Sequence, residues 1–210
     1  MAKGKRELKQ ARLDERAEAI RRQAAIEARN RNLIIAAFAA LVIGGFVVLY
    51  ILTVNPFYHP PGFKDTSYAV ADEGATHIPS TQVPTYKHQP PSSGPHYSEA
   101  GKGPIAAANY TTEQAPGGWV HNLEHGYIVL AYTCTTDCTS IHDQIQAEIA
   151  NIPKESHFNE VKFLATPYQG MTAKFALLAW DRELDMPSFD ATTLEGFYGK
   201  YVDHGREDLA

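Results

Sequence analysis

The sequence is poor in cysteine, and it has only one long apolar segment. Its 210 residues include two cysteines, three methionines and two tryptophans. Hydrophobic residues make up 44% of the chain and charged residues 20%, which is typical of a folded domain. These totals exclude a disordered chain and a membrane protein with several spans. The length allows one globular domain with appendages.

Positive charge is scarce after the first 32 residues. Residues 1–32 contain ten Lys or Arg and five Asp or Glu, whereas residues 55–210 contain nine and nineteen. Residues 33–54 carry no charge. The basic arm is short and of mixed charge, so nucleic acid is not an expected partner. We expect residues 1–32 to form a basic helical segment in the cytoplasm, held near anionic lipid.

The uncharged segment 33–54 has the length of a membrane span. As a helix its 22 residues rise about 33 Å, enough to cross a hydrocarbon core of about 30 Å. A cleaved signal peptide would have an apolar stretch of only about 7–15 residues, so an uncleaved signal anchor is expected. Arginines stand just before the segment, and the next Lys or Arg after it is Lys64. The positive-inside rule therefore places the C-terminal domain outside the cytoplasmic membrane, with a single pass and the N-terminus inside.

The remainder of the chain divides into a proline-rich part and a part with regular periodicity. Nine of the thirteen prolines lie in residues 55–104. We therefore expect a juxtamembrane linker over residues 55–84, followed by a globular domain over 85–210 that opens with a proline-rich loop. Apolar patterns predict strands over 126–132, 161–166 and 175–180, and helices over 139–152 and 193–202. This strand-helix-strand-strand-helix order predicts a small α+β fold with helices on one face of the sheet.

The two cysteines are close in sequence. Outside the cytoplasm, Cys134 and Cys138 are expected to form a disulfide. Their C-x-x-x-C spacing is one residue longer than the redox motif C-x-x-C, which disfavours a redox pair. A thiolate metal site is the remaining alternative.

The hexapeptide His-Asn-Leu-Glu-His-Gly at 121–126 is the strongest chemical signal. Two imidazoles and a carboxylate in five residues are typical of a metal site. The hexapeptide also matches the H-x-x-E-H pattern of inverzincin zinc peptidases, which requires a helix. The glycines on both sides argue against a helix. In a strand His121 and His125 would be about 13 Å apart, so a shared site needs a bend or a single helical turn. The alternative is that both histidines bond only to loop backbone.

Four motifs resemble a bacterial family known as domain of unknown function 3105. They are Pro-Pro-Ser-Ser-Gly-Pro-His-Tyr at 90–97, Val-His-Asn-Leu-Glu-His-Gly at 120–126, Thr-Pro-Tyr at 166–168 and Ala-Leu-Leu-Ala-Trp at 176–180. The resemblance covers roughly residues 80–205 and implies a membrane-anchored or secreted protein of a family without settled activity. It also implies that His96, His121 and His125 belong to one site. Asp181 stands where the family usually has glycine.

The predicted loop between the strands 161–166 and 175–180 contains Met171. A thioether beside imidazoles in an oxidising compartment favours copper over zinc, whereas three histidines without it leave both metals open. We expect His96, His121, His125 and Met171 as ligands. Glu124 is expected to orient one imidazole without binding the ion.

Three functions are compatible with these features. The favoured one is a copper-type metal-binding module that delivers or buffers metal for envelope or respiratory membrane proteins. The second is a non-catalytic accessory subunit of a membrane complex, in which the histidines are structural. The third is a metal-dependent hydrolase with Glu124 as general base.

Overall fold

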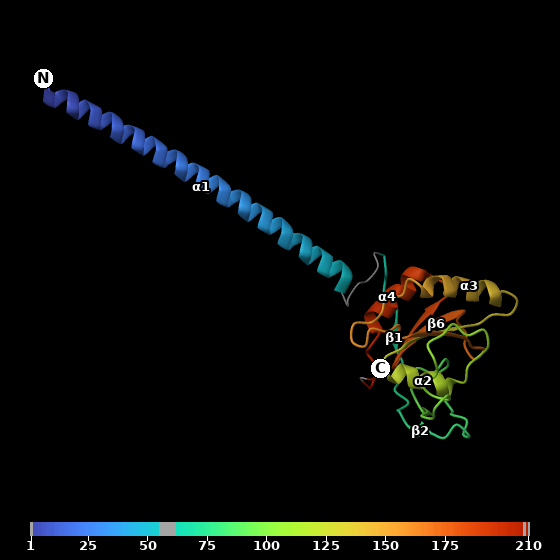
Figure 1. The fold of residues 1–210 in the computed structure, drawn as a ribbon. Coiled ribbons are helices and arrows are strands. Elements are labelled where there is room, and N and C mark those ends of the chain that lie inside the picture. Colours follow the sequence, from blue (N-terminus) through green and yellow to red (C-terminus); the bar gives the residue numbers. More distant parts are fainter. Residues whose placement is uncertain (1, 55–61, 208, 210) are drawn as a thin grey trace. The chain divides into compact units, whose positions relative to one another are not determined.

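A computed structural model describes residues 2–54, 62–207 and 209, which form two separate units (Figure 1). The first unit is a single helix, α1 (Ala2–Val54). The second is a mixed α and β domain. Residues 55–61, the start of the expected linker, lie outside the described residues.

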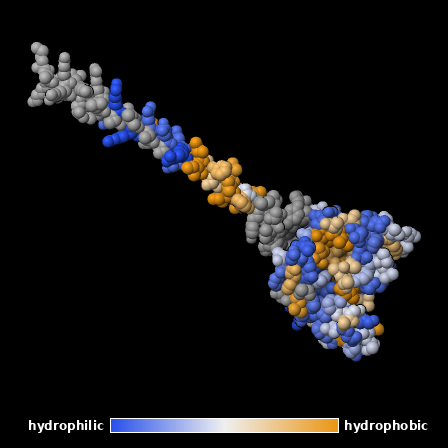
Figure 2. All heavy atoms as spheres, in the orientation of Figure 1, coloured by the Kyte–Doolittle hydropathy of each residue, from blue (hydrophilic) through white to orange (hydrophobic). Residues whose placement is uncertain are grey.

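Within α1, the segment Arg29–Val48 is long and apolar enough to cross a membrane. Figure 2 shows apolar side chains on this part of the helix. All described side chains from Leu33 to Val48 are exposed. A helical segment that is apolar on all sides suits a lipid environment. The sequence-based prediction of one apolar N-terminal helix of spanning length is confirmed.

The second unit is built on a five-stranded sheet with the order β1-β7-β6-β4-β5. β4 and β5 are parallel, and the other neighbours are antiparallel. Helix α3 (Cys138–Ile149) makes the crossover between the two parallel strands. The strands are β1 (Tyr68–Ala69), β4 (Ile128–Tyr132), β5 (Phe163–Pro167), β6 (Phe175–Ala179) and β7 (Arg182–Met186).

Helices cover both faces of the sheet, not one face as expected. Alternate residues of β4 enter two apolar clusters: Ile128, Leu130 and Tyr132 join one, and Val129 and Ala131 join the other. The first cluster includes residues of α3 and α4 (Ala191–Tyr201). The second is covered by α2 (Pro116–Glu124), which the sequence did not predict (Figure 1).

The other predicted elements form close to their expected positions. The strands expected over 126–132, 161–166 and 175–180 are β4, β5 and β6, and the helices over 139–152 and 193–202 are α3 and α4. Strand β7 was missed. Its sequence Arg-Glu-Leu-Asp-Met is rich in charge, and it becomes a strand because it pairs along β6, so tertiary context overrides local propensity.

The domain begins earlier in the chain than residue 85. Tyr68 and Ala69 of β1 pair with Glu183 and Arg182 of β7. A second, two-stranded sheet joins β2 (His77–Ile78) to β3 (His96–Tyr97). At the other side of the main sheet, the loop at Asn109 bridges to Ala165 of β5. Part of the segment assigned to the linker is therefore part of the fold.

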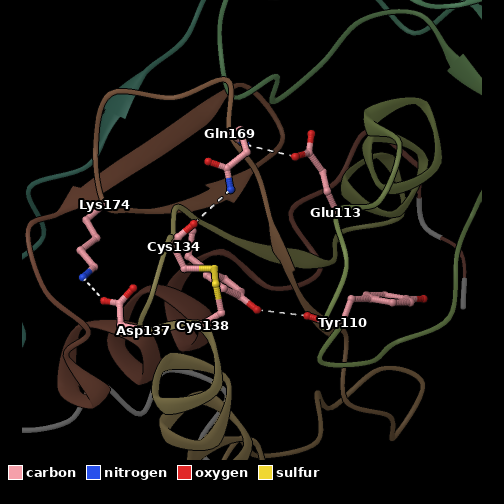
Figure 3. Close-up of a disulfide and its surroundings, with 8 residues drawn as sticks. Tyr110, Glu113, Cys134, Asp137, Cys138, Gln169 and Lys174 are labelled. Atoms are coloured by element: carbon pink, nitrogen blue, oxygen red, sulfur yellow. Dashed lines mark hydrogen bonds and ion pairs between the residues drawn. A yellow bond between two sulfur atoms is a disulfide. The ribbon is translucent and has the colours of Figure 1, made fainter.

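The two cysteines lie close together at the start of α3. Cys134 and Cys138 are joined by a disulfide across the turn that follows β4 (Figure 3). The side chain of Gln169 donates a hydrogen bond to the Cys134 carbonyl at 3.4 Å. Closing so short a loop contributes about 2 kcal/mol in the chain-entropy account. Because the sulfur atoms are bonded to each other, they are not available as thiolate ligands.

Asp181 occupies a backbone position that suits glycine. Its φ angle is 54°, in the left-handed region, at the turn between β6 and β7. Its backbone N–H donates to the Ser92 carbonyl at 3.2 Å, a bond that glycine would keep. Burial raises the pKa of the Asp181 carboxyl, and repulsion from Asp72 adds to the rise, while a hydrogen bond from Ser93 opposes it. The charged side chain therefore destabilises the folded state.

The substitution Asp181→Gly should raise the free energy of unfolding at pH 7 by about 1 kcal/mol, because glycine adopts the left-handed backbone conformation without strain. The greater entropy of glycine in the unfolded chain offsets part of this gain. A carboxyl whose pKa is raised on folding costs stability only above its unfolded value of about 3.9. The gain should therefore shrink as the pH falls toward 3.9. Urea denaturation of both proteins at several pH values measures it, and a loss of stability at pH 7 would contradict the prediction.

Candidate metal centre

Helix α2 forms despite its two glycines. Pro116 occupies the first turn, where its missing N–H is not needed. A Cβ atom at Gly117 would lie 2.7 Å from the Tyr97 ring. The glycine is therefore a point of close contact, and it does not stop the helix. Gly126, at φ 80°, follows the end of α2. Packing Tyr97 onto α2 also brings the neighbouring His96 to this helix.

The helical conformation places the two histidines of the hexapeptide on one face. The ring centroids of His121 and His125 are 4.7 Å apart, and their Nε2 atoms are 3.1 Å apart. The sequence-based argument against a helix was wrong, because the glycines that motivated it serve packing. Asn122 fixes the same helix to a loop: its side chain accepts from the Ile105 N–H at 3.0 Å and donates to the Ile105 carbonyl at 2.8 Å.

A fourth histidine joins the site through strand pairing. β2 and β3 run parallel, and His77 is the direct partner of His96 in their register. Their ring centroids are 4.8 Å apart. His77 was not predicted as a ligand, and it lies in the segment expected to be a linker. Both strands have a histidine followed by an apolar residue, but two residues are too few to produce a periodic signal.

Three imidazoles and one carboxylate converge at this point. One ligand atom from each of His77, His96, His121 and Glu124 lies within 4.8 Å of all the others. Two ligands of a tetrahedral ion with bonds of about 2.1 Å lie about 3.4 Å apart, so the most distant pair would have to approach by up to roughly 1.4 Å for all four atoms to bind one ion. His96, His121 and Glu124 are buried, whereas the His77 side chain is 46% exposed.

Backbone carbonyls set the tautomers of the two buried imidazoles. His96 Nδ1–H donates to the Gly94 carbonyl at 2.8 Å, and His121 Nδ1–H donates to the Tyr97 carbonyl at 2.5 Å. A carbonyl can only accept, so each Nδ1 carries the hydrogen in these contacts. The Nε2 lone pair of the neutral ring then points toward Glu124 in His96 and toward His125 in His121. Metal-binding histidines in proteins are oriented in this way.

The contact between Glu124 and His96 is attractive if a positive charge lies between the two side chains. Glu124 Oε2 is 2.9 Å from His96 Nε2 and 3.3 Å from His77 Nε2. A neutral His96 in its assigned tautomer would direct a lone pair at the carboxylate oxygen. A proton or a metal ion between the two atoms converts this repulsion into attraction.

His121 is electrostatically suited to bind a metal. Burial lowers the pKa of His121, and repulsion from His125, His96 and His77 adds to the effect, while the bond to the Tyr97 carbonyl opposes it. The ring therefore stays neutral at pH values where an ordinary histidine begins to be protonated. The neutral ring is the ligand form.

The structure assigns Glu124 and His125 different places from those expected. Glu124 was expected only to orient an imidazole, but its carboxylate is part of the group of four side chains that could hold a metal ion. His125 was expected as a ligand. Its ring contacts His121, and its Nε2 lies 3.7 Å from Glu207 Oε2, so it adjoins the four-residue group from outside.

Met171 lies toward the other end of the sheet. It follows β5, which ends at Pro167 opposite Tyr132, and it packs against the apolar cluster covered by α2. His125, by contrast, precedes the first residue of β4. The five residues of β4 span roughly 13 Å. The structure therefore does not bring the thioether to the histidines, and the argument for copper that rested on it loses its basis.

The chain was compared with protein-family models, with curated proteins and with solved structures. The last two comparisons found no match. A family match covers residues 77–210, and its first position is the histidine that β2 contributes to the site. Because this match spans well over half of the sequence, the chain belongs to the family described as "Protein of unknown function (DUF3105)".

Proposed function

We propose that this protein is a metal-binding module that holds one divalent transition-metal ion, Zn²⁺ or Cu²⁺, between His77, His96, His121 and Glu124. The observation that carries the proposal is the convergence of these four ligand atoms within 4.8 Å in a largely buried place. The fixed tautomers of His96 and His121 support it, because they direct both Nε2 lone pairs away from the backbone.

The donor set favours a borderline divalent ion. Imidazole nitrogen suits zinc and copper, and a carboxylate oxygen adds negative charge for a divalent ion. Sulfur ligands would instead favour Cu⁺. With Met171 packed in an apolar cluster, a Cu⁺ site has no support from the geometry, so the substitution Met171→Leu should leave metal affinity unchanged.

We further propose that α1 anchors the site outside the cytoplasm, where the domain supplies or buffers metal for envelope or respiratory membrane proteins. The apolar segment Arg29–Val48 and the basic residues before it support this arrangement. Protease digestion of intact cells stripped of their wall tests the orientation. A tag at the C-terminus should be cut, and a tag at the N-terminus should be protected.

A hydrolase is less well supported. A general base must face the metal-bound water, whereas the Glu124 carboxylate contacts two other ligands directly. A cavity of about 370 Å³ is lined by residues 68–73, Lys87 and His88, and none of the four ligands belongs to its lining. The accessory-subunit alternative requires that the purified protein bind no metal.

Elemental analysis of the full-length protein, purified in detergent without chelators, tests the proposal. The wild type should contain about one equivalent of zinc or copper, and His121→Ala should contain almost none. His142→Ala is the matched control, because His142 lies on α3 and its ring contacts the Asn109 carbonyl and the Asp143 carboxylate. A metal-free wild type, or full metal content in His121→Ala, would overturn the proposal.

A further inference from the structure

Side chains that can bind metal continue from the four-residue group to the surface. His121 Nε2 is 3.1 Å from His125 Nε2, which is 3.7 Å from Glu207 Oε2. Exposure rises along this row. His96 is fully buried, and His121 is 4% exposed. The side chains of His125 and Glu207 are 9% and 42% exposed. The row therefore joins the buried ligands to solvent.

The spacing along the row suits metal coordination. Two ligands of a tetrahedral ion with bonds of about 2.1 Å lie about 3.4 Å apart. The two observed separations, 3.1 Å and 3.7 Å, lie on either side of this value. An ion could therefore be held by His125 and Glu207, or by His125 and His121, with only small movements of the side chains.

The fold holds Glu207 in this position. The Glu207 N–H donates to the Glu124 carbonyl at 2.9 Å, and the Asp203 N–H donates to the Gly126 carbonyl at 2.9 Å. A Cβ atom at Gly205 would lie 2.2 Å from the Gly126 nitrogen, so the C-terminal segment lies directly on the end of α2. The buried ammonium group of Lys162 adds a bond to the His125 carbonyl at 3.1 Å.

We propose that His125 and Glu207 form a transfer position through which the metal ion passes between solvent and the buried ligands, an inference that rests on the metal site proposed above. The ion first binds Glu207 and His125 with water completing its shell. His121 Nε2 then replaces one water. Glu124 and His96 then replace Glu207 and His125 one after the other, while His121 stays bound, and His77 replaces the remaining water. The ion remains divalent throughout, and each ligand that binds displaces one ligand or one water.

A transfer position changes rates without changing the final equilibrium. In the full-length protein in detergent, Zn²⁺ loading and removal by excess EDTA are measured by stopped flow. We expect His125→Ala and Glu207→Gln to slow both steps about tenfold or more, with the Kd for Zn²⁺ unchanged within about threefold, because Kd is the ratio of the two rates. Glu207→Gln keeps the backbone bond between residues 207 and 124, which holds the C-terminal segment on α2. It therefore still tests the inference if His125→Ala folds poorly.

Arg206→Gln is the matched control. It changes the neighbouring residue of the same segment and removes the ion pair with Asp72, 3.7 Å, but leaves the row intact. Its rates should equal those of the wild type. Unchanged rates in both test variants would mean that the ion enters elsewhere, for example past the exposed His77, and would overturn the inference. A Kd weakened more than tenfold would make His125 a resident ligand, which also overturns it. A wild type that binds no Zn²⁺ would defeat the metal site itself.

Discussion

Saturating Zn²⁺ is expected to raise the melting temperature of the second unit by about 8–16 °C. A ligand that binds only the folded state stabilises it by about 4 kcal/mol at a thousand times its Kd. For a domain of this size each kcal/mol shifts the melting temperature by about 2–4 °C. The four ligands come from β2, β3 and α2, so the ion would cross-link the proline-rich segment to the helix. Differential scanning calorimetry of the full chain with and without Zn²⁺ measures the shift.

Two comparisons make the melting experiment specific. Mg²⁺ should give no shift, because it prefers an octahedral shell of oxygen ligands. The substitution His96→Ala should abolish the shift produced by Zn²⁺, since His96 is fully buried and its Nε2 faces Glu124. An equal shift for wild type and His96→Ala would show that the stabilising ion binds elsewhere.

The substitution Glu124→Gln is expected to weaken Zn²⁺ binding by about 100-fold or more. It removes the only negative charge among the four ligands, and a neutral amide oxygen attracts a divalent cation much less strongly. The loss should match that of a histidine ligand. Isothermal titration with Zn²⁺ at pH 7.5 measures it, a pH at which the lowered pKa of His121 keeps that ring neutral.

Glu113→Gln is the matched control for this substitution, because Glu113 is an exposed carboxylate that accepts a weak bond from the Gln169 N–H at 3.3 Å (Figure 3). Its affinity for Zn²⁺ should equal that of the wild type. If Glu124→Gln bound Zn²⁺ as tightly as the wild type, Glu124 would not be a ligand. The role of general base in a hydrolase would then regain support.

The sequence predicted part of the site. The hexapeptide identified His121 as a ligand candidate and Glu124 as a residue that orients an imidazole, and the family resemblance added His96, whose ring centroid lies 5.0 Å from that of His121. His77 could not be found, because it joins the site through a two-residue strand whose partner is distant in sequence. Met171 was inferred from residue type alone, which does not show at which end of the sheet a loop lies.

The sequence predicted the central strands of the sheet better than helix α2, which covers one face, and better than the edge strand β1. Continuous apolar runs marked β4, β5 and β6, whose residues are all buried. Helix α2 was missed because Gly117 and Gly118 lower helix propensity. Their close contacts show why they are there: Gly117 faces the Tyr97 ring, and Gly118 faces the Lys102 carbonyl. The boundary expected at residue 85 was late for a similar reason: β1 is held by its pairing with β7 and carries no signal of its own.

The two edges of the main sheet are both partly covered, and this bears on aggregation. An exposed edge strand offers unpaired N–H and carbonyl groups to another chain. The outer edge of β5 is occupied at its centre, where Ala165 exchanges backbone bonds with Ala108 and Tyr110 at 2.9 and 2.8 Å. The other edge carries the two residues of β1, and beyond them β7 presents the exposed charge of Asp185. If α1 holds many copies in one membrane, these covered edges would keep crowded domains from joining strand to strand.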